Sequence, residues 1–259
     1  MEIEDINTIK GIIEEKLEPK KYEIKDIEKQ IKGFIIFSKE KYKKKEKEKL
    51  FKAYKNEKCL KNIYENMQNI PCSRYFYIEE ITNDNLYKTR KGILTYIMLN
   101  PSYASSNESD STMNRARKWA TMVCNNEENV GFKYFAVINL YSYRHHCPNE
   151  LKRILSNEEK IPTNYEKEDN ISFIKKYLET KISKDFVLAF GNNDFDERTI
   201  INLIKSHYSN CQFKTFFHEI NEKPYHLLAR KKVLNDKKKV TLQNINVDTT
   251  REKYIYEIK

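Results

Sequence analysis

Short runs of apolar residues alternate with segments of helical periodicity from Arg74 onward. The apolar runs predict strands at Tyr75–Ile81, Ile93–Leu99, Phe135–Leu140, Phe186–Phe190 and Phe213–Phe217, with a weaker one near Val240–Ile245. The helical periods predict helices at about Thr112–Asn125, Pro148–Leu155, Glu168–Lys181 and Asp196–His207. Because several runs are almost wholly apolar, they predict central strands covered on both faces. The pattern therefore indicates an α/β fold with helices packed on a sheet.

The first seventy residues differ in kind from the rest, since they are dense in Lys and Glu and contain no Arg. Apolar residues recur every three or four positions over Ile6–Leu17 and over Ile24–Ile35, which predicts two helices separated near a proline. The stretch Lys39–Lys55 is so charged that it predicts either a phosphate-binding arm or a solvated helix face. We therefore expect a Lys-rich helical segment over residues 1–71 and an α/β core domain over residues 72–259.

The chain of 259 residues carries a net charge of +10. This excess favours a polyanionic partner such as nucleic acid, because phosphates attract Lys and Arg and release counterions on binding. Abundant Lys, Asn, Ile and Tyr are also what an AT-rich genome produces, so a merely solvated basic surface stays open. The five cysteines are scattered without zinc spacing, and no apolar run is long enough for a membrane span. We expect a cytoplasmic protein with free thiols, no metal, no cofactor and no membrane partner.

Polar residues directly follow two of the predicted buried strands. In MLNPSYAS, Asn100 and Pro101 predict a turn that directs the amide towards the strand ends, and Ser102 and Tyr103 come next. In INLYSYRH, Asn139 lies inside an apolar strand, where a carboxamide is costly unless it meets a partner. A carboxamide can read the edge of a pyrimidine. A satisfied core amide and an ordinary Asn-Pro turn are equally open interpretations.

Candidates for charge and stacking come from three other places. Tyr141 and Arg144 combine an aromatic ring with a cation, the pairing that stacks unpaired bases and binds phosphates. His226 and Arg230 belong to KPYHLLAR, after the last predicted core strand, and a neutral imidazole there could donate a hydrogen bond to an anion. Asp110 precedes the first core helix, where it either caps that helix or orients a water molecule.

Four blocks of the chain resemble, in order and spacing, a bacterial and phage family known as domain of unknown function 1643. The blocks are MLNPSYASSNESDSTMNRARKWA, YFAVINLYSYRHHCPNEL, FVLAFGNNDFDERTI and KPYHLLAR. The resemblance runs from about Arg74 to Arg230. It departs at the last block, where that family has His-Pro-Leu after a basic residue and this chain reads YHLL.

The same blocks are similar, more distantly, to the uracil-DNA glycosylase superfamily. That resemblance implies a three-layer α/β sandwich with a mostly parallel central sheet, with the N-terminal helical segment as an addition. It implies that Asn100 positions the attacking water and that Pro101 shapes its turn. It also implies that Asn139 reads the base and that His226 stabilises the departing base. Met98 stands where that superfamily has a glycine.

The leading hypothesis is an enzyme that hydrolyses the N-glycosidic bond of a damaged or modified base, in DNA rather than RNA, in repair or phage defence. Its catalytic residues would be Asn100, His226 and Asp110. Its substrate-binding residues would be Pro101, Ser102, Tyr103, Asn139, Tyr141, Arg144 and Arg230. The alternatives are a non-catalytic nucleic-acid-binding module and a hydrolase of free nucleotides or nucleosides. The sequence does not indicate the oligomeric state.

Overall fold

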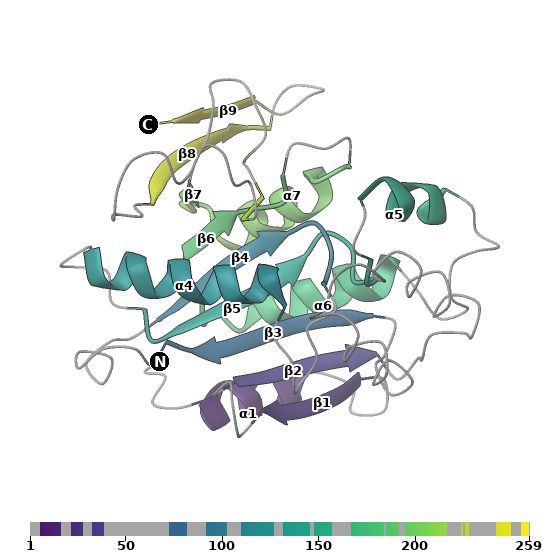
Figure 1. The fold of residues 1–259 in the computed structure, drawn as a ribbon, viewed down its shortest axis with the longest axis vertical. Helices are drawn as coiled ribbons and strands as arrows, with labels where there is room; N and C mark the ends of the chain where they lie inside the picture. Colours follow the sequence, from purple (N-terminus) through teal and green to yellow (C-terminus); the bar gives the residue numbers. More distant parts are fainter. Residues whose placement is uncertain are drawn as a thin grey trace.

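The computed structural model describes residues 6–16, 22–27, 33–38, 73–81, 92–102, 110–126, 132–145, 148–156, 167–183, 185–191, 195–216, 224, 226–227, 242–249 and 255–258. Within these ranges the strands form one nine-stranded sheet in the order β1-β2-β3-β5-β4-β6-β7-β8-β9 (Figure 1). The strands are β1 (Tyr22–Ile27), β2 (Gly33–Ser38), β3 (Arg74–Glu80), β4 (Ile93–Met98), β5 (Tyr134–Asn139), β6 (Asp185–Leu188), β7 (Phe213–Thr215), β8 (Gln243–Asp248) and β9 (Ile255–Ile258). The helices are α1 (Ile6–Lys16), α4 (Ser111–Asn126), α5 (Pro148–Leu155), α6 (Lys167–Glu179) and α7 (Arg198–His207).

The centre of the sheet is parallel and its two sides are antiparallel. β4 pairs in parallel with β5 and with β6, and β6 pairs in parallel with β7. The other strands join through antiparallel pairs. A parallel pair needs a long crossover between its strands, and α4, α6 and α7 supply such crossovers only for the central strands. The expectation of a mostly parallel sheet is therefore wrong outside the centre.

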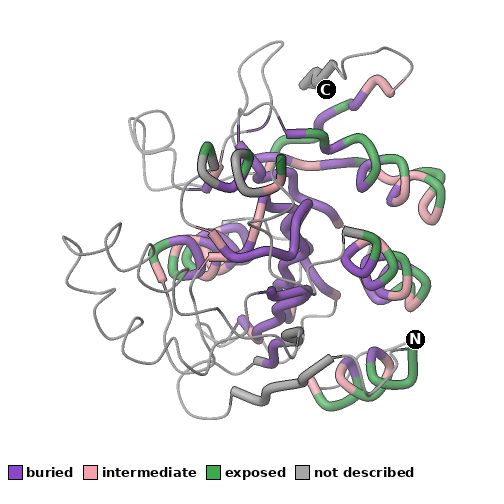
Figure 2. Tube along the Cα trace, turned by 90° about the vertical axis from the view of Figure 1, so that its right-hand side faces the viewer, coloured by how far each residue is buried: buried purple, intermediate pink, exposed green. Residues whose placement is uncertain are grey.

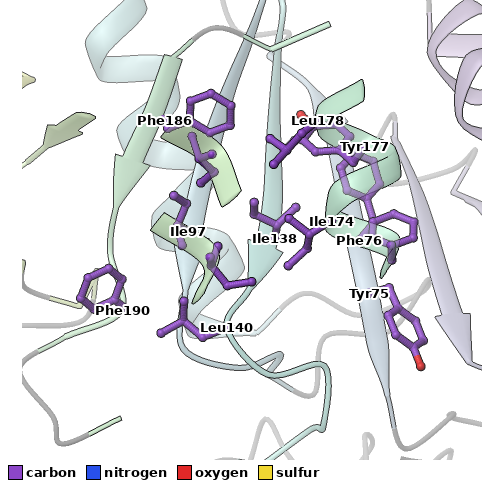
Figure 3. Close-up of a cluster of buried hydrophobic side chains, with 14 of the residues drawn as sticks. Tyr75, Phe76, Ile97, Ile138, Leu140, Ile174, Tyr177, Leu178, Phe186 and Phe190 are labelled. Carbon is purple, nitrogen blue, oxygen red and sulfur yellow. The ribbon is translucent and has the colours of Figure 1, made fainter. Parts of the chain in front are cut away.

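Helices cover both faces of the sheet, as the α/β pattern predicted. α4 packs on one face, and α1, α6 and α7 pack on the other (Figure 1). The central strands are buried, whereas the outer sides of the helices are exposed (Figure 2). The core on the α6 side includes Phe76, Ile97, Ile138, Leu140 and Ile174 (Figure 3). The core under α4 includes Tyr96, Val137 and Trp119.

The N-terminal segment is only partly helical. α1 confirms the first predicted helix and packs against α6. The second predicted helix, Ile24–Ile35, is wrong, because this stretch contains parts of β1 and β2, an antiparallel pair that extends the sheet beyond β3. Gly33 disfavours a helix, β-branched isoleucines favour strands, and β3 offers its backbone as a pairing partner. The stretch Lys39–Lys55 and the expected domain boundary near residue 71 lie outside the described residues.

The other predicted elements lie within a few residues of their expected positions. The apolar runs became β3 to β7, the weaker run became β8, and all four predicted core helices are present as α4 to α7. β9 has no counterpart among the predicted strands. Across the described ranges, no helix combines the length and the apolar character needed to cross a membrane.

Candidate functional site at the carboxyl edge of the parallel strands

The winding of the sheet reverses at β4, because the chain continues from β4 to β5 on one side of it and from β6 to β7 on the other. β4 is followed by α4 on one face, whereas β5 and β6 are followed by α6 and α7 on the other. Because β4 and β6 are neighbours, the connections that leave their carboxyl ends diverge, the first through α4 on one face and the second through α7 on the other. In open α/β sheets, ligands bind outside the carboxyl ends of the strands at such a reversal. The fold therefore favours a ligand site just past Met98 of β4, whose pairing partner in the neighbouring strand β5 is Asn139.

Asn139 is the last residue of β5 and pairs with Met98 of β4. Its side chain is buried, at 1% exposure, yet within the described structure neither Oδ1 nor Nδ2 has a hydrogen-bond partner. Since Val137 belongs to the core under α4, strand alternation directs Asn139 to the same face. Leaving a buried polar group unsatisfied costs about 1–3 kcal/mol, so most find partners. Asn139 thus retains donor and acceptor capacity that no side chain or backbone group of the described structure uses.

Other buried polar atoms without a partner in the described structure gather at the same edge. They include Ser102 Oγ after β4, Ser142 Oγ after β5 and Asn170 Oδ1 in the first turn of α6. The backbone of this edge is well connected, because Leu140 N–H donates to the carbonyl of Met98 at 2.8 Å. The unsatisfied groups therefore belong to side chains, not to a loosely held backbone.

Buried polar side chains nearer the amino ends of these strands are satisfied. Thr95 Oγ1 lies 2.8 Å from the hydroxyl of Tyr177 and 2.7 Å from that of Ser183. Ser183 also lies within 3.1 Å of the carbonyl of Ile93, to which it can donate. Burial raises the pKa of Tyr177, so its hydroxyl stays protonated and can donate. The contrast between the two ends of the sheet favours the carboxyl edge as the place where a ligand completes the hydrogen bonding.

Asn100 connects the segments that follow β4 and β5. Its Nδ2 donates to the carbonyl of Pro101 at 3.2 Å, to that of Tyr143 at 3.5 Å and to that of His145. These bonds fix the predicted turn against the segment after β5, and Pro101 is buried there. The amide nitrogen of Asn100 is thus engaged with backbone, which leaves its Oδ1 as the atom that could accept a hydrogen bond from water.

Asp110 and His226 interact electrostatically at the start of α4. Asp110 Oδ1 accepts a hydrogen bond from the backbone N–H of Met113 at 2.9 Å, which confirms the helix cap. Burial lowers the pKa of His226 from its ordinary value of 6.5, and the carboxylate of Asp110 opposes that shift. His226 is therefore mostly neutral at pH 7 and can donate one hydrogen bond.

The segment before His226 is held against the end of β6. The N–H of Gly191 donates to the carbonyl of Pro224 at 3.0 Å. Gly191 has a φ of 85°, a conformation that side chains disfavour, so glycine suits this turn. Leu227 is buried in the core under α4 together with Met98. The His226 segment thus lies on the same face of the sheet as Asn139.

Arg74 lies at this edge, although the sequence pattern did not predict it. The pairing of β2 with β3 skips Tyr75, and this bulge puts Arg74 on the α4 face. Arg74 Nη2 lies 3.9 Å from Met113 Sδ, and its guanidinium carbon lies 5.7 Å from the ring centre of Tyr77. Its backbone N–H donates to the carbonyl of Ser142 at 2.9 Å. The only feature of the sequence that could have indicated Arg74 is its position as a basic residue directly before an apolar strand.

Arg144 and Arg74 are both buried, at 0% and 1% exposure. An antiparallel bridge between Ser73 and Tyr143 brings their two segments together. Arginine is seldom fully buried, because its charge is costly to remove from water. Two guanidinium groups therefore lie buried beside the segment that follows β5.

Tyr141 lies in the other layer of the molecule. Its ring centre lies 5.2 Å from that of Phe195, in the core that contains α6 and α7. Burial, together with the carboxylates of Asp196 and Glu197, raises the pKa of Tyr141. The structure thus separates Tyr141 from the α4 face on which Asn139 lies, and its stacking role stays a prediction.

Two predicted binding residues, Tyr103 and Arg230, lie outside the described residues. Over the ranges that are described, His, Cys, Asp and Glu side chains form no group of three or more that could hold a metal ion. Of the predicted set, Asn100, Pro101, Ser102, Asn139 and Arg144 thus follow or end the central strands β4 and β5, and Asp110 interacts with His226 at the start of α4. Arg74, Ser142 and Asn170 are buried residues of the same edge that the sequence did not indicate.

Comparison with known proteins gives one match. No curated protein and no solved structure matches the chain. A family model does match, over residues 74–228, which contain the strands β3 to β7 and the edge residues from Arg74 to His226 described above. Because the match spans more than half of the chain, the protein belongs to the family described as protein of unknown function DUF1643.

Proposed function

We propose that this protein hydrolyses the N-glycosidic bond of a base in DNA, with Asn139 reading the edge of the base. The observation that carries the proposal is the buried carboxamide of Asn139, which has no hydrogen-bond partner in the described structure and ends a central parallel strand. A base presents adjacent donors and acceptors on its edge, and a carboxamide matches such a pair. The resemblance to uracil-DNA glycosylases supports the same assignment.

The chemistry needs few participating groups. As the C1′–N bond breaks, its electron pair leaves with the base, which becomes an anion, and the sugar becomes an oxocarbenium ion. A water oxygen then bonds to C1′, and the proton it loses ends on the base or in solvent. Placement of the water and stabilisation of the anion are the main contributions that a protein can make.

Residues of the edge suit both contributions. Neutral His226 donates a hydrogen bond to the departing base, and Oδ1 of Asn100 orients the water. Asp110 tunes His226 by opposing the effect of burial on its pKa.

Nucleic acid as the substrate is supported by the net charge of +10. A base must leave the stack to reach a site that is buried beside a strand end, and unstacking costs a few kcal/mol. Hydrogen bonds to the base edge recover part of that cost, which is why the unsatisfied groups of Asn139 and Ser142 matter. Positive charge on the surface would hold the flanking phosphates.

The test measures base release from DNA duplexes and single strands that contain uracil, thymine mismatches or modified bases, in the presence of EDTA. We expect alkali-labile sites with at least one substrate. The rate of base release should fall at least about 100-fold in Asn139→Ala, because no carboxamide then hydrogen-bonds to the edge of the base. Asn246→Ala is the matched control, since Asn246 is exposed on β8 at the far side of the sheet.

Other outcomes separate the alternatives. Hydrolysis of mononucleosides or mononucleotides without activity on polymers would favour a small-molecule hydrolase. Salt-sensitive DNA binding with no base release, and no change in Asn139→Ala, would favour a non-catalytic binding module. Failure to release any base from the whole panel rules out the proposed activity for those substrates.

A further inference from the structure

Asn170 contacts the end of β5 from the opposite face of the sheet. It lies in the first turn of α6, is 0% exposed, and belongs to the helix whose Ile174 lies in the same core as Ile138 and Leu140 (Figure 3). Its Nδ2 donates to the carbonyl of Asn139 at 3.0 Å and to the carbonyl of Leu140 at 3.0 Å. One side-chain amide thus holds two consecutive carbonyls, the first of which belongs to Asn139 itself.

This bonding marks a bend directly after Asn139. In a regular strand, successive peptide groups point to opposite sides, so one donor does not normally reach two consecutive carbonyls. The N–H groups of Leu140 and Tyr141 also point the same way, since they donate to the carbonyls of Met98 at 2.8 Å and Leu99 at 2.9 Å. The chain therefore leaves the strand at Leu140, with β4 holding one side of the bend and Asn170 the other.

We propose that Asn170 is a positioning residue that aims the carboxamide of Asn139 at the ligand. This inference rests on the proposed function for the identity of the ligand. The contact between Asn170 and the two carbonyls does not depend on it. The two peptide groups that Asn170 holds fix the backbone on the carboxyl side of Asn139, and hence the direction of its Cα–Cβ bond. No hydrogen bond orients the Asn139 carboxamide in the described structure, so its direction depends on the backbone and on the packing around it.

The chemistry of Asn170 agrees with this role. Two carbonyl oxygens need two N–H donors, and a carboxamide nitrogen has two hydrogens. Its own Oδ1 is buried without a partner in the described structure, so the orientation of the amide is set by the two carbonyls. Aspartate offers no donor when ionised, and alanine leaves both carbonyls without this donor.

The first arm of the test observes Asn139 directly and needs no ligand. The full-length protein is labelled with ¹⁵N-asparagine, and the side-chain NH₂ signals of Asn139 are assigned by their loss in Asn139→Ala. In Asn170→Ala we expect these signals to shift or broaden. The matched control is Ser183→Ala, which removes buried hydrogen bonds near the amino end of the same sheet and should leave the Asn139 signals in place.

The second arm measures the affinity of free uracil and free cytosine by titration calorimetry. We expect Asn170→Ala to weaken binding roughly tenfold, as is usual for a coupled neighbour, and Ser183→Ala to leave it unchanged. In the Asn139→Ala background, Asn170→Ala should cause no further loss, because the carboxamide that it positions is gone. A purely structural role would instead give additive losses.

The outcomes separate the two proposals. If the wild-type protein binds neither base, the proposed function fails for these bases, and the Asn139 signals alone decide the role of Asn170. Unchanged Asn139 signals in Asn170→Ala overturn the positioning role, as do additive losses of affinity. If Asn170→Ala does not fold, Asn170→Ser, which keeps one donor, carries the same measurements with a smaller expected change.

Discussion

Two asparagines at the same strand end are in opposite states. Both are buried, but Asn139 makes no side-chain hydrogen bond in the described structure, whereas Asn170 donates to two backbone carbonyls. A buried polar group with partners stabilises a fold, and one without partners destabilises it. Sites that bind ligands often retain such unfavourable groups, because stability there competes with function. At the residue scale, the same substitution at these two positions should therefore change the free energy of unfolding in opposite directions.

Asn139→Leu should raise the free energy of unfolding by about 1 kcal/mol, because leucine has a similar shape and removes an unsatisfied carboxamide. The same variant should lose base binding. Asn170→Leu should lower the free energy of unfolding by about 1–3 kcal/mol, since two buried carbonyls lose a donor. Urea unfolding of the two variants beside the wild type measures both changes. Destabilisation of equal size in both would contradict the assignment of Asn139 as unsatisfied.

The protonation of His226 should respond to Asp110. Asp110→Asn removes the carboxylate that opposes the effect of burial, so the pKa of His226 should fall further below 6.5. Asparagine still caps α4, which keeps the helix in place. An NMR titration of the imidazole protons measures the shift. Asp185→Asn, at the amino end of β6, is the control and should leave the pKa of His226 unchanged.

The same pKa direction fixes how His226 affects stability. Because the folded protein holds His226 with a lowered pKa, it binds fewer protons than the unfolded chain between the two pKa values. The stability contributed by neutral His226 is complete above pH 6.5 and is lost as the pH falls below that value. His226→Gln should therefore flatten the decline in stability below pH 6.5. An unchanged profile in that variant would contradict the lowered pKa of His226.

At the scale of elements, α4 is held on the sheet by a charged cluster as well as by its apolar face. Glu79 of β3 is buried and accepts hydrogen bonds from Tyr77 and from the guanidinium of Arg117, whose Nη2 lies 3.0 Å from Oε2. Burial and the Glu79 carboxylate raise the pKa of Tyr77 well above 10. Although burial alone lowers the pKa of Arg117, Glu79 raises it overall. The start of α4, with Asp110 and Met113, is thereby fixed relative to β3.

Arg117→Ala should destabilise the protein by roughly 3 kcal/mol, because it leaves the Glu79 carboxylate buried with its main counter-charge removed. Replacing both residues, as in Glu79→Leu with Arg117→Leu, should recover much of that loss, since no buried charge remains. Unfolding in urea of the single and double variants forms a double-mutant cycle. Additive losses would show that the two side chains do not depend on each other.

At the scale of the whole molecule, the chain combines a basic composition with a sheet whose winding reverses between β4 and its neighbours. The net charge of +10 acts over distances of about a Debye length, roughly 10 Å in 0.1 M salt, so it influences a polymer beyond any single contact. The reversal of the winding sets where a ligand can approach the strand ends. Attraction of nucleic acid and recognition of a base would thus be separate properties of the molecule.

Binding of a single-stranded oligonucleotide should weaken with salt. We expect a plot of log K against log salt with a slope steeper than about −2, which corresponds to about three neutralised phosphates on single strands. Asn139→Leu, with the same net charge, should give the same slope, because the electrostatic attraction does not use the carboxamide. Fluorescence anisotropy between 50 and 300 mM salt measures it. A slope near zero would instead show that the basic surface is only solvated and does not bind phosphates.

The sequence indicated the core elements because their signals are local. The apolar runs at β4, β5 and β6 leave few alternatives to buried strands, and Asp110 before α4 is a cap that can be recognised within a few residues. The periodicity of Ile24–Ile35 misled, because isoleucine spacing alone does not distinguish a helix from two short strands with a turn. Pairing with β3 decided between them.

The residues of the site divide in the same way. Asn100 and Asn139 stand out in the sequence because each amide interrupts or ends an apolar run. An apolar run predicts a buried segment, so a polar residue within it is conspicuous. Arg74 and Asn170 do not stand out, since the first depends on a bulge between β2 and β3 and the second on the docking of α6. By itself the sequence determined which segments are buried and which polar groups end them. Only the tertiary structure decided strand directions, faces and hydrogen-bond partners, because these depend on contacts between residues far apart in the chain.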